Sequence, residues 1–345
     1  MNERTQNPSP DQLRSPREIE GVSLQEFQKQ ISETYEPIVV RQLARDWNLV
    51  KAATQSADAA AGYLKKFDGG GLLPLVVCPA ETEGRLFYDE NYDGFNFTRE
   101  KLTLSEGLNR MLSRTGGDPF SFFQCLPVAA AVPGLEGELT NPIVPEKTKP
   151  HVWIGSRITV AAHFDEAKNV AIVAAGRRRF TLFPPEQVNN LYIGRLDFTP
   201  AGQPISLADP KTPDFERHPR FREALDAAFS VELLAGDAIY IPAPWWHHVE
   251  SLDNLNVLVN YWWDGALAAS GLPFTALIHA IQAYRHLAQP ERNAWKSLVE
   301  HYAFESDGDP AAHLAPNNPG ILAPMNPDLA RHIDRWLAAL IGQSK

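Results

Sequence analysis

The chain has 345 residues, of which 44% are hydrophobic and 21% are charged, and its formal net charge is −10 at pH 7. This composition is typical of a globular protein with enough apolar material for a sizeable core. An acidic chain is a poor general partner for nucleic acid, because binding phosphates requires a basic surface. The two cysteines, Cys78 and Cys125, lie far apart in the sequence, so neither a disulfide scaffold nor a thiolate zinc site is indicated.

No apolar run reaches the ~20 residues that a membrane span needs. The polar N-terminus also lacks the apolar segment of a secretory signal. We therefore expect a cytoplasmic protein with no membrane partner, beginning with a disordered tail over residues 1–20.

Residues 21–119 carry mixed helical and strand patterns. The sequence Ser23-Leu24-Gln25-Glu26 has the form of a capping box and predicts a helix. An apolar, β-branched run over 37–43 predicts a strand, and helical spacing over 52–67 predicts a second helix. We expect this region to form an α+β extension, since no catalytic motif is visible in it.

The pattern changes over residues 120–265, where short apolar runs alternate with turn signals. Many short strands at this spacing predict a sandwich or barrel rather than alternating βαβ units. The predicted strands are 120–126, 151–154, 157–163, 170–174, 177–183, 231–234, 238–241, 247–251 and 256–263. A long Pro-rich excursion over 184–230, with one short helix at 221–229, interrupts them.

Residues 266–345 return to helical periodicity. Helices are predicted over 274–287, 292–302 and 327–341, and their apolar stripes need a partner surface. Two interpretations stay open at this point: the helices cover the barrel, or they form the interface of a homodimer.

The chemistry that the sequence offers centres on His163-Phe164-Asp165. Residues i and i+2 of a strand project to the same face, so the imidazole and the carboxylate converge at a strand end. Two histidines and one carboxylate form a facial set that binds Fe(II) and leaves its other side open. A third ligand is sought at His247-His248, where only one of two adjacent strand residues can face the pair. Strand geometry alone does not choose between them.

Five segments, in this order along the chain, resemble the JmjC-type and cupin-8-type 2-oxoglutarate oxygenases. Within that family the resemblance is greatest to the asparaginyl hydroxylase that inhibits hypoxia-inducible factor. The segments are HFDEAKN (163–169), GRRRFTLFPPEQ (176–187), DFERHPRF (214–221), GDAIYIPAPWWHHVES (236–251) and VNYWW (259–263). The resemblance implies a double-stranded β-helix, or jelly roll, as the catalytic core over 120–265. The N-terminal extension and the C-terminal helices, which form a dimer in this family, would surround it.

The same resemblance implies the metal ligands. Carried over residue by residue, it assigns Fe(II) binding and catalysis to His163, Asp165 and His247. His248 would then point away from the metal. Asn169 and Asn260 fall where the family places amides beside 2-oxoglutarate and the metal.

The expected cosubstrate site departs from the family at several positions. Arg178 stands where the resembling hydroxylase has the lysine that binds the distal carboxylate of 2-oxoglutarate. Arginine keeps the charge and can form two hydrogen bonds to a carboxylate. Because strand residues alternate between faces, we expect Arg178 to face inward and Arg177 and Arg179 to face outward. Phe122 stands where a tyrosine is expected and Val160 where a threonine is, with Thr159 adjacent on the other predicted face. The predicted cosubstrate site therefore comprises Arg178, Asn169, Asn260, Thr159 and Phe122.

The resemblance implies an Fe(II)- and 2-oxoglutarate-dependent dioxygenase, most simply a hydroxylase. Such an enzyme couples the decarboxylation of 2-oxoglutarate by O2 to hydroxylation of a C–H bond. The implied substrate is an Asn, Asp, His or Arg side chain of a protein or peptide, with a small molecule as the alternative. Two other classes remain open. A non-catalytic cupin-like binding module would form no succinate, and a metal-dependent cupin isomerase or hydrolase would act without oxygen.

Overall fold

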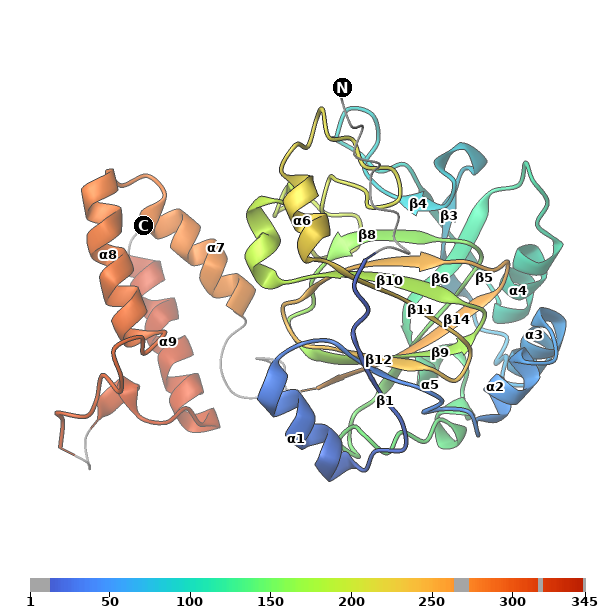
Figure 1. The fold of residues 1–345 in the computed structure, drawn as a ribbon, viewed down its shortest axis with the longest axis horizontal. Helices are drawn as coiled ribbons and strands as arrows, with labels where there is room; N and C mark the ends of the chain where they lie inside the picture. The colour runs from blue at the N-terminus through green and yellow to red at the C-terminus, as the bar shows by residue number, and fades with distance from the viewer. Residues whose placement is uncertain (1–12, 264–272, 316–318, 344–345) are drawn as a thin grey trace, which may run out of the picture. The chain divides into compact units, whose positions relative to one another are not determined.

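The computed structural model describes residues 13–263, 273–315 and 319–343, and Figure 1 shows the fold. The chain divides into two compact units, the first ending at Trp263 and the second starting at Asp264. The first unit holds all the described β-strands, and the described part of the second is helical. None of the described helices is long and apolar enough to cross a membrane.

Eight strands of the first unit form the predicted jelly roll. One sheet contains them in the order β12-β9-β14-β7 and the other in the order β11-β10-β13-β8, with antiparallel neighbours throughout. Apart from β10 and β11, consecutive strands belong to opposite sheets, which is how a double-stranded β-helix winds. Their bounds are β7 Pro150–Gly155, β8 Thr159–His163, β9 Lys168–Ala175, β10 Arg178–Phe183, β11 Phe229–Leu233, β12 Ala238–Ile241, β13 Trp246–Ser251 and β14 Asn256–Trp263.

The N-terminal residues extend both sheets. The first sheet grows to nine strands and the second to five. The added strands are β1 Arg17–Ile19, β2 Ile38–Val40, β3 Leu73–Cys78, β5 Thr98–Leu102 and β6 Phe120–Pro127 in the first sheet and β4 Arg85–Leu86 in the second. The accompanying helices are α1 Leu24–Thr34, α2 Asn48–Ala53, α3 Ala57–Lys65, α4 Leu104–Ser113 and α5 Val128–Ala131. Figure 1 shows α2, α3 and α4 grouped beside this extension.

Three apolar clusters pack against the two sheets of the jelly roll. The largest lies between the nine-stranded sheet and the N-terminal helices, where the ring of Phe27 meets Tyr240 edge-on at 5.5 Å. A second cluster fills the space between the two sheets and includes Val173, Phe180 and Leu258. The third lies beneath the 184–230 excursion, which packs with its helix α6 (Phe221–Ala227) on the outer face of the five-stranded sheet. The excursion is therefore a folded cover.

Several predicted elements differ from the structure. The helix predicted over 52–67 is two helices, because Ser56 begins α3 by accepting a hydrogen bond from the Ala59 amide at 3.0 Å. Strand β5 was not predicted, since its sequence is polar and four of its five side chains are exposed. Residues 1–12 of the predicted tail lie outside the described part. Residues 13–20 are packed, because β1 pairs with β2 and Arg14 donates to the Ala227 carbonyl at 2.9 Å.

The second unit contains α7 Pro273–Tyr284, α8 Gln289–Tyr302 and α9 Pro327–Gln343. These bounds agree with the helical periodicity of the sequence. Tyr284 and Trp295 stack with ring centroids 5.6 Å apart. Neither α7 nor α8 contains a buried residue, so this unit has little apolar core of its own.

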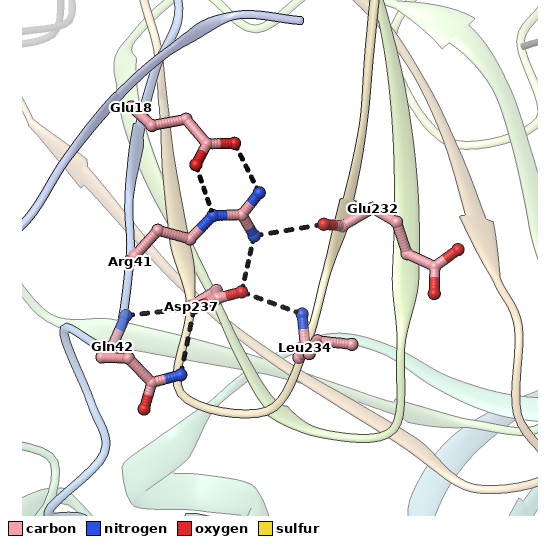
Figure 2. A network of polar contacts seen from close by, with 6 residues as sticks. All are labelled: Glu18, Arg41, Gln42, Glu232, Leu234 and Asp237. Carbon is pink, nitrogen blue, oxygen red and sulfur yellow. Dashed lines mark hydrogen bonds and ion pairs between the residues drawn. The ribbon is translucent and has the colours of Figure 1, made fainter. Parts of the chain in front are cut away.

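A buried ion pair fastens the N-terminal strands to the barrel (Figure 2). Asp237, only 2% exposed, follows Gly236 in the turn between β11 and β12. Its carboxylate accepts hydrogen bonds from Arg41 Nη1 at 2.7 Å and from the Gln42 amide at 3.0 Å. Arg41 in turn binds Glu18 of β1 through both carboxylate oxygens. Asp237, near the start of the segment over 236–251, thus has a structural role.

We expect Asp237→Ala to lower the free energy of unfolding by about 1.5–3 kcal/mol, because Arg41 and the backbone amides of Gln42 and Leu234 lose a charged acceptor. The measurement is equilibrium urea unfolding. Asp197→Ala is the matched control, since Asp197 pairs with Arg195 but is 75% exposed, and its loss should cost no more than about 1 kcal/mol. Equal, small losses for the two variants would show that Asp237 does not fasten the extension.

Candidate functional site

The three predicted metal ligands lie together between the sheets. His163 ends β8 and stands directly opposite His247 of β13, so the two rings share a face and their centroids are 4.2 Å apart. Oδ2 of Asp165 lies 3.7 Å from Nε2 of His247. Potential ligand atoms of the three side chains all lie within 4.8 Å of one another, and no other such group of His, Cys, Asp or Glu occurs in the described residues.

Backbone carbonyls orient both imidazoles. Nδ1 of His163 lies 2.9 Å from the Ala161 carbonyl oxygen, and Nδ1 of His247 lies 3.1 Å from that of Trp245. In the neutral ring each Nδ1 then carries the proton, which leaves the Nε2 lone pair free for a metal. Burial, and then the neighbouring His163, hold the pKa of His247 below its usual range, so this ring is neutral at pH 7. A neutral imidazole is the form that binds metal.

Side chains of the other sheet hold Asp165. Its Oδ2 accepts hydrogen bonds from Trp262 Nε1 at 2.9 Å and from Asn169 Nδ2 at 3.2 Å. Asn260 Nδ2 donates to Asn169 Oδ1 at 2.9 Å. The predicted amides therefore lie at the site, where they orient the carboxylate.

Trp262 was not among the residues predicted to bind the metal or the cosubstrate. Its inward orientation follows from the strand period, because it lies two positions after Asn260 on β14. Its contact with Asp165 depends on the pairing of β14 with β9, in which Trp262 stands opposite Asn169. Local sequence patterns do not predict how β14 and β9 align.

A cavity opens from these ligands into the space between the sheets. Its walls are mostly apolar or aromatic. Besides the three ligands and the two amides, the lining residues are Trp153, Val160, Arg178, Phe180, Val249, Leu258 and Trp262. Such a cavity suits a small molecule that extends away from the metal.

Arg178 brings a positive charge to this cavity. It is 6% exposed, its Nε is buried without a partner, and the described residues provide its side chain with no hydrogen bond or ion pair. Burial lowers its pKa, but a guanidinium remains protonated at neutral pH. The adjacent Arg177 faces outward instead, where it pairs with Asp253 at 2.9 Å. The predicted alternation, with one arginine of the run facing inward, is therefore observed.

The remaining predicted cosubstrate residues are placed differently. A bulge sets Val160 opposite Val249 although His163 stands opposite His247, so Val160 and His163 both face the cavity. Phe122 lines a smaller cavity that also contains Arg178. Thr159 lines neither cavity, and its register partners Arg85 and Glu250 place it on the outer face. The structure thus does not bring Thr159 to the predicted cosubstrate site.

His248 occupies the other face of β13, as alternation requires. It stands opposite Thr181 of β10 and is 1% exposed. Burial lowers its pKa, and its ring is on the opposite side of the sheet from the His163 and His247 pair. The structure therefore brings His247, and not His248, to the cluster.

Several known proteins are similar to parts of this chain. Human HSPB1-associated protein 1 is 36% identical over 113 residues, which are 32% of this chain and 22% of that protein. Lysine-specific demethylase JMJ31 of Arabidopsis thaliana is 33% identical over 113 residues, covering 32% of this chain and 20% of that protein. JmjC domain-containing protein D of Dictyostelium discoideum is 24% identical over 253 residues, covering 67% and 52%.

This chain thus spans between about a fifth and about half of the length of these relatives. The model of one family, described as a cupin-like domain, matches residues 24–268. That match covers the jelly roll, the metal-ligand cluster and most of the N-terminal extension. The chain belongs to the cupin-like domain family, of the JmjC type.

Proposed function

We propose that this chain is an Fe(II)- and 2-oxoglutarate-dependent dioxygenase that hydroxylates a C–H bond. The observation that carries the proposal is the unpaired Arg178 in the same cavity as the His-Asp-His cluster. The cluster alone suits any metal-dependent cupin. A metal site with a buried cation in the same cavity suits a co-reactant that chelates the metal at one end and carries a carboxylate at the other.

In this proposal, each residue of the site has a separate role in binding the metal or the cosubstrate. Bound Fe(II) and 2-oxoglutarate would supply the oxidising chemistry, with O2 as oxidant. His163 and His247 would bind the ion through Nε2, and Asp165 through its carboxylate. Arg178 would neutralise the distal carboxylate of the cosubstrate, which removes the cost of its own buried charge. The aromatic and aliphatic walls would exclude water from the reacting atoms.

A protein side chain is the substrate class that we favour. One relative is named a lysine-specific demethylase, and another is named for its association with HSPB1. These names support a protein substrate or partner without identifying the residue modified, and a small molecule remains the alternative. The cytoplasmic location also stays a prediction.

The C-terminal unit supports the proposed homodimer. Its described residues expose large apolar side chains, among them Trp295 at 46%, Leu298 at 47% and Trp336 at 47%. Helices that display such stripes are stabilised when another surface covers them. A second copy of the chain offers the same stripes, and a symmetric pair would bury both sets.

The cosubstrate proposal predicts a weak visible charge-transfer band when 2-oxoglutarate is added anaerobically to the Fe(II)-loaded protein. His247→Ala should abolish the band, because it removes one of three ligands. Arg178→Met should weaken 2-oxoglutarate binding by about 10- to 100-fold, the effect of losing a hydrogen-bonded charge. Arg177→Met is the matched control and should bind normally, since Arg177 faces outward.

Iron binding without a band in the wild-type protein would contradict 2-oxoglutarate as cosubstrate. Equal losses in the two arginine variants would contradict the role of Arg178. The two alternative classes of function can be distinguished with the same protein preparation. A binding module forms no succinate with any candidate substrate, and an isomerase or hydrolase keeps its activity without O2.

Trp262→Phe should weaken metal binding by about 10- to 100-fold, because the hydrogen bond that orients Asp165 is lost while the ring remains. The affinity is measured by competition with a metal-binding dye. Trp153→Phe is the control, since Trp153 lines the same cavity but, among the described hydrogen bonds, makes none to the three metal-binding side chains. If Trp262→Phe binds metal as the wild type does, the indole does not position Asp165.

Light scattering of the full chain should give twice the monomer mass of 38.4 kDa. Leu298→Glu should reduce the mass to that of a monomer, because it places a charge on the apolar stripe of α8. Lys296→Glu is the control, since two helical positions turn it to the opposite side of α8. A monomeric wild-type protein would refute the dimer.

A further inference from the structure

A second cavity adjoins the first behind Arg178. It is smaller than the main cavity and shares Arg178, Trp153 and Val160 with it. Its remaining walls are Phe122, Ile154, Gly155, Ser156, Ile158 and Ser251. Arg178 therefore stands between the two spaces, and the groups around it determine how an anion would be held.

The walls near Arg178 lack the two hydroxyl groups expected from the resembling family, since Phe122 and Val160 occupy those positions. Only two hydroxyl-bearing side chains line this second cavity, Ser156 and Ser251. The hydroxyl of Ser156 is already used. It accepts from the Ser121 amide at 3.0 Å and donates to the Ser121 carbonyl at 3.1 Å.

Ser251 is placed to act on the same group as Arg178. It ends β13 and stands directly opposite Arg178 of β10. Directly opposite residues share a face, with Cβ atoms about 4.5–5.5 Å apart. Ser251 is 7% exposed, and the described contacts give its hydroxyl no protein partner. The Ser251 hydroxyl can therefore add a hydrogen-bond donor beside the unpaired Arg178 guanidinium.

We propose that Ser251 is a binding residue for the distal carboxylate of the 2-oxo dicarboxylic acid and acts together with Arg178. A carboxylate has two oxygens and about four acceptor sites, so the two N–H groups of a guanidinium leave room for a further donor. The Ser251 hydroxyl takes the place of the donors that Phe122 and Val160 cannot supply. This inference rests on the proposed function, because it assigns a residue to the cosubstrate of that site.

The test uses the full-length protein loaded with Mn(II), which binds such sites without turnover. Binding of Mn(II) is followed by the EPR signal of the free ion, and binding of 2-oxoglutarate by calorimetry. Ser251→Ala should leave Mn(II) binding unchanged and weaken 2-oxoglutarate binding about 10- to 100-fold. Ser251→Thr, which keeps the hydroxyl, should bind close to the wild type. Ser156→Ala, in the same cavity, should also bind normally.

The outcomes separate this inference from the function on which it rests. If wild-type protein binds Mn(II) but not 2-oxoglutarate, the proposed function fails and the inference fails with it. If wild-type protein binds 2-oxoglutarate and Ser251→Ala binds it equally well, only the role of Ser251 is overturned. The role is also overturned if Ser251→Thr loses as much affinity as Ser251→Ala, or if Ser156→Ala does. In those cases the shape of the cavity, rather than the hydroxyl, controls binding.

Discussion

An unpaired guanidinium inside the jelly roll is the feature on which the interpretation of the site depends. Taking a charged group out of water is costly unless a partner compensates it. Elsewhere in the fold such a partner is present, as in the pairing of Arg41 with the buried Asp237. Arg178 has no such partner among the described residues, although it is almost fully buried. In the proposed function, an anion that enters the cavity compensates this charge.

The position of that charge follows from sheet geometry. The two-residue period of β10 turns Arg178 inward and Arg177 toward the carboxylates outside. Pairing with β13 then places Arg178 opposite Ser251 and Leu182 opposite His247. The metal cluster and the cation thus lie on the same face of one sheet, separated by four residues of strand, which is roughly 13 Å between Cα atoms. The second sheet supplies the groups that hold Asp165. A ligand that bridges the two ends would contact both sheets.

Local sequence patterns predicted the parts of this arrangement that depend on strand period. These include the convergence of His163 with Asp165 and the inward Arg178. The jelly roll and the choice of His247 came from the resemblance of ordered segments, since strand period leaves both histidines of the pair available. The structure adds what depends on register between distant strands. The bulge that turns Val160 inward, the bond from Trp262 to Asp165 and the position of Ser251 all arise from pairings across more than 70 residues.

The differences between the predicted and the observed N-terminal elements have a similar cause. Strand β5 is polar and takes its strand form from pairing with β3, which its own residues do not predict. Residues 17–19 form β1 because β2 provides a partner, and Arg41 fixes Glu18 beside it. Local polarity alone suggested a tail there. In both places a tertiary contact overrides the local preference.

The central claim is that one molecule spans the metal cluster and Arg178. The most direct test is anomalous diffraction from crystals grown with Mn(II) and 2-oxoglutarate. The account predicts one anomalous peak bound by His163, Asp165 and His247, and a dicarboxylate that chelates it and ends on the Arg178 guanidinium. A metal bound elsewhere, or a dicarboxylate whose distal end leaves Arg178 without a partner, would contradict the account.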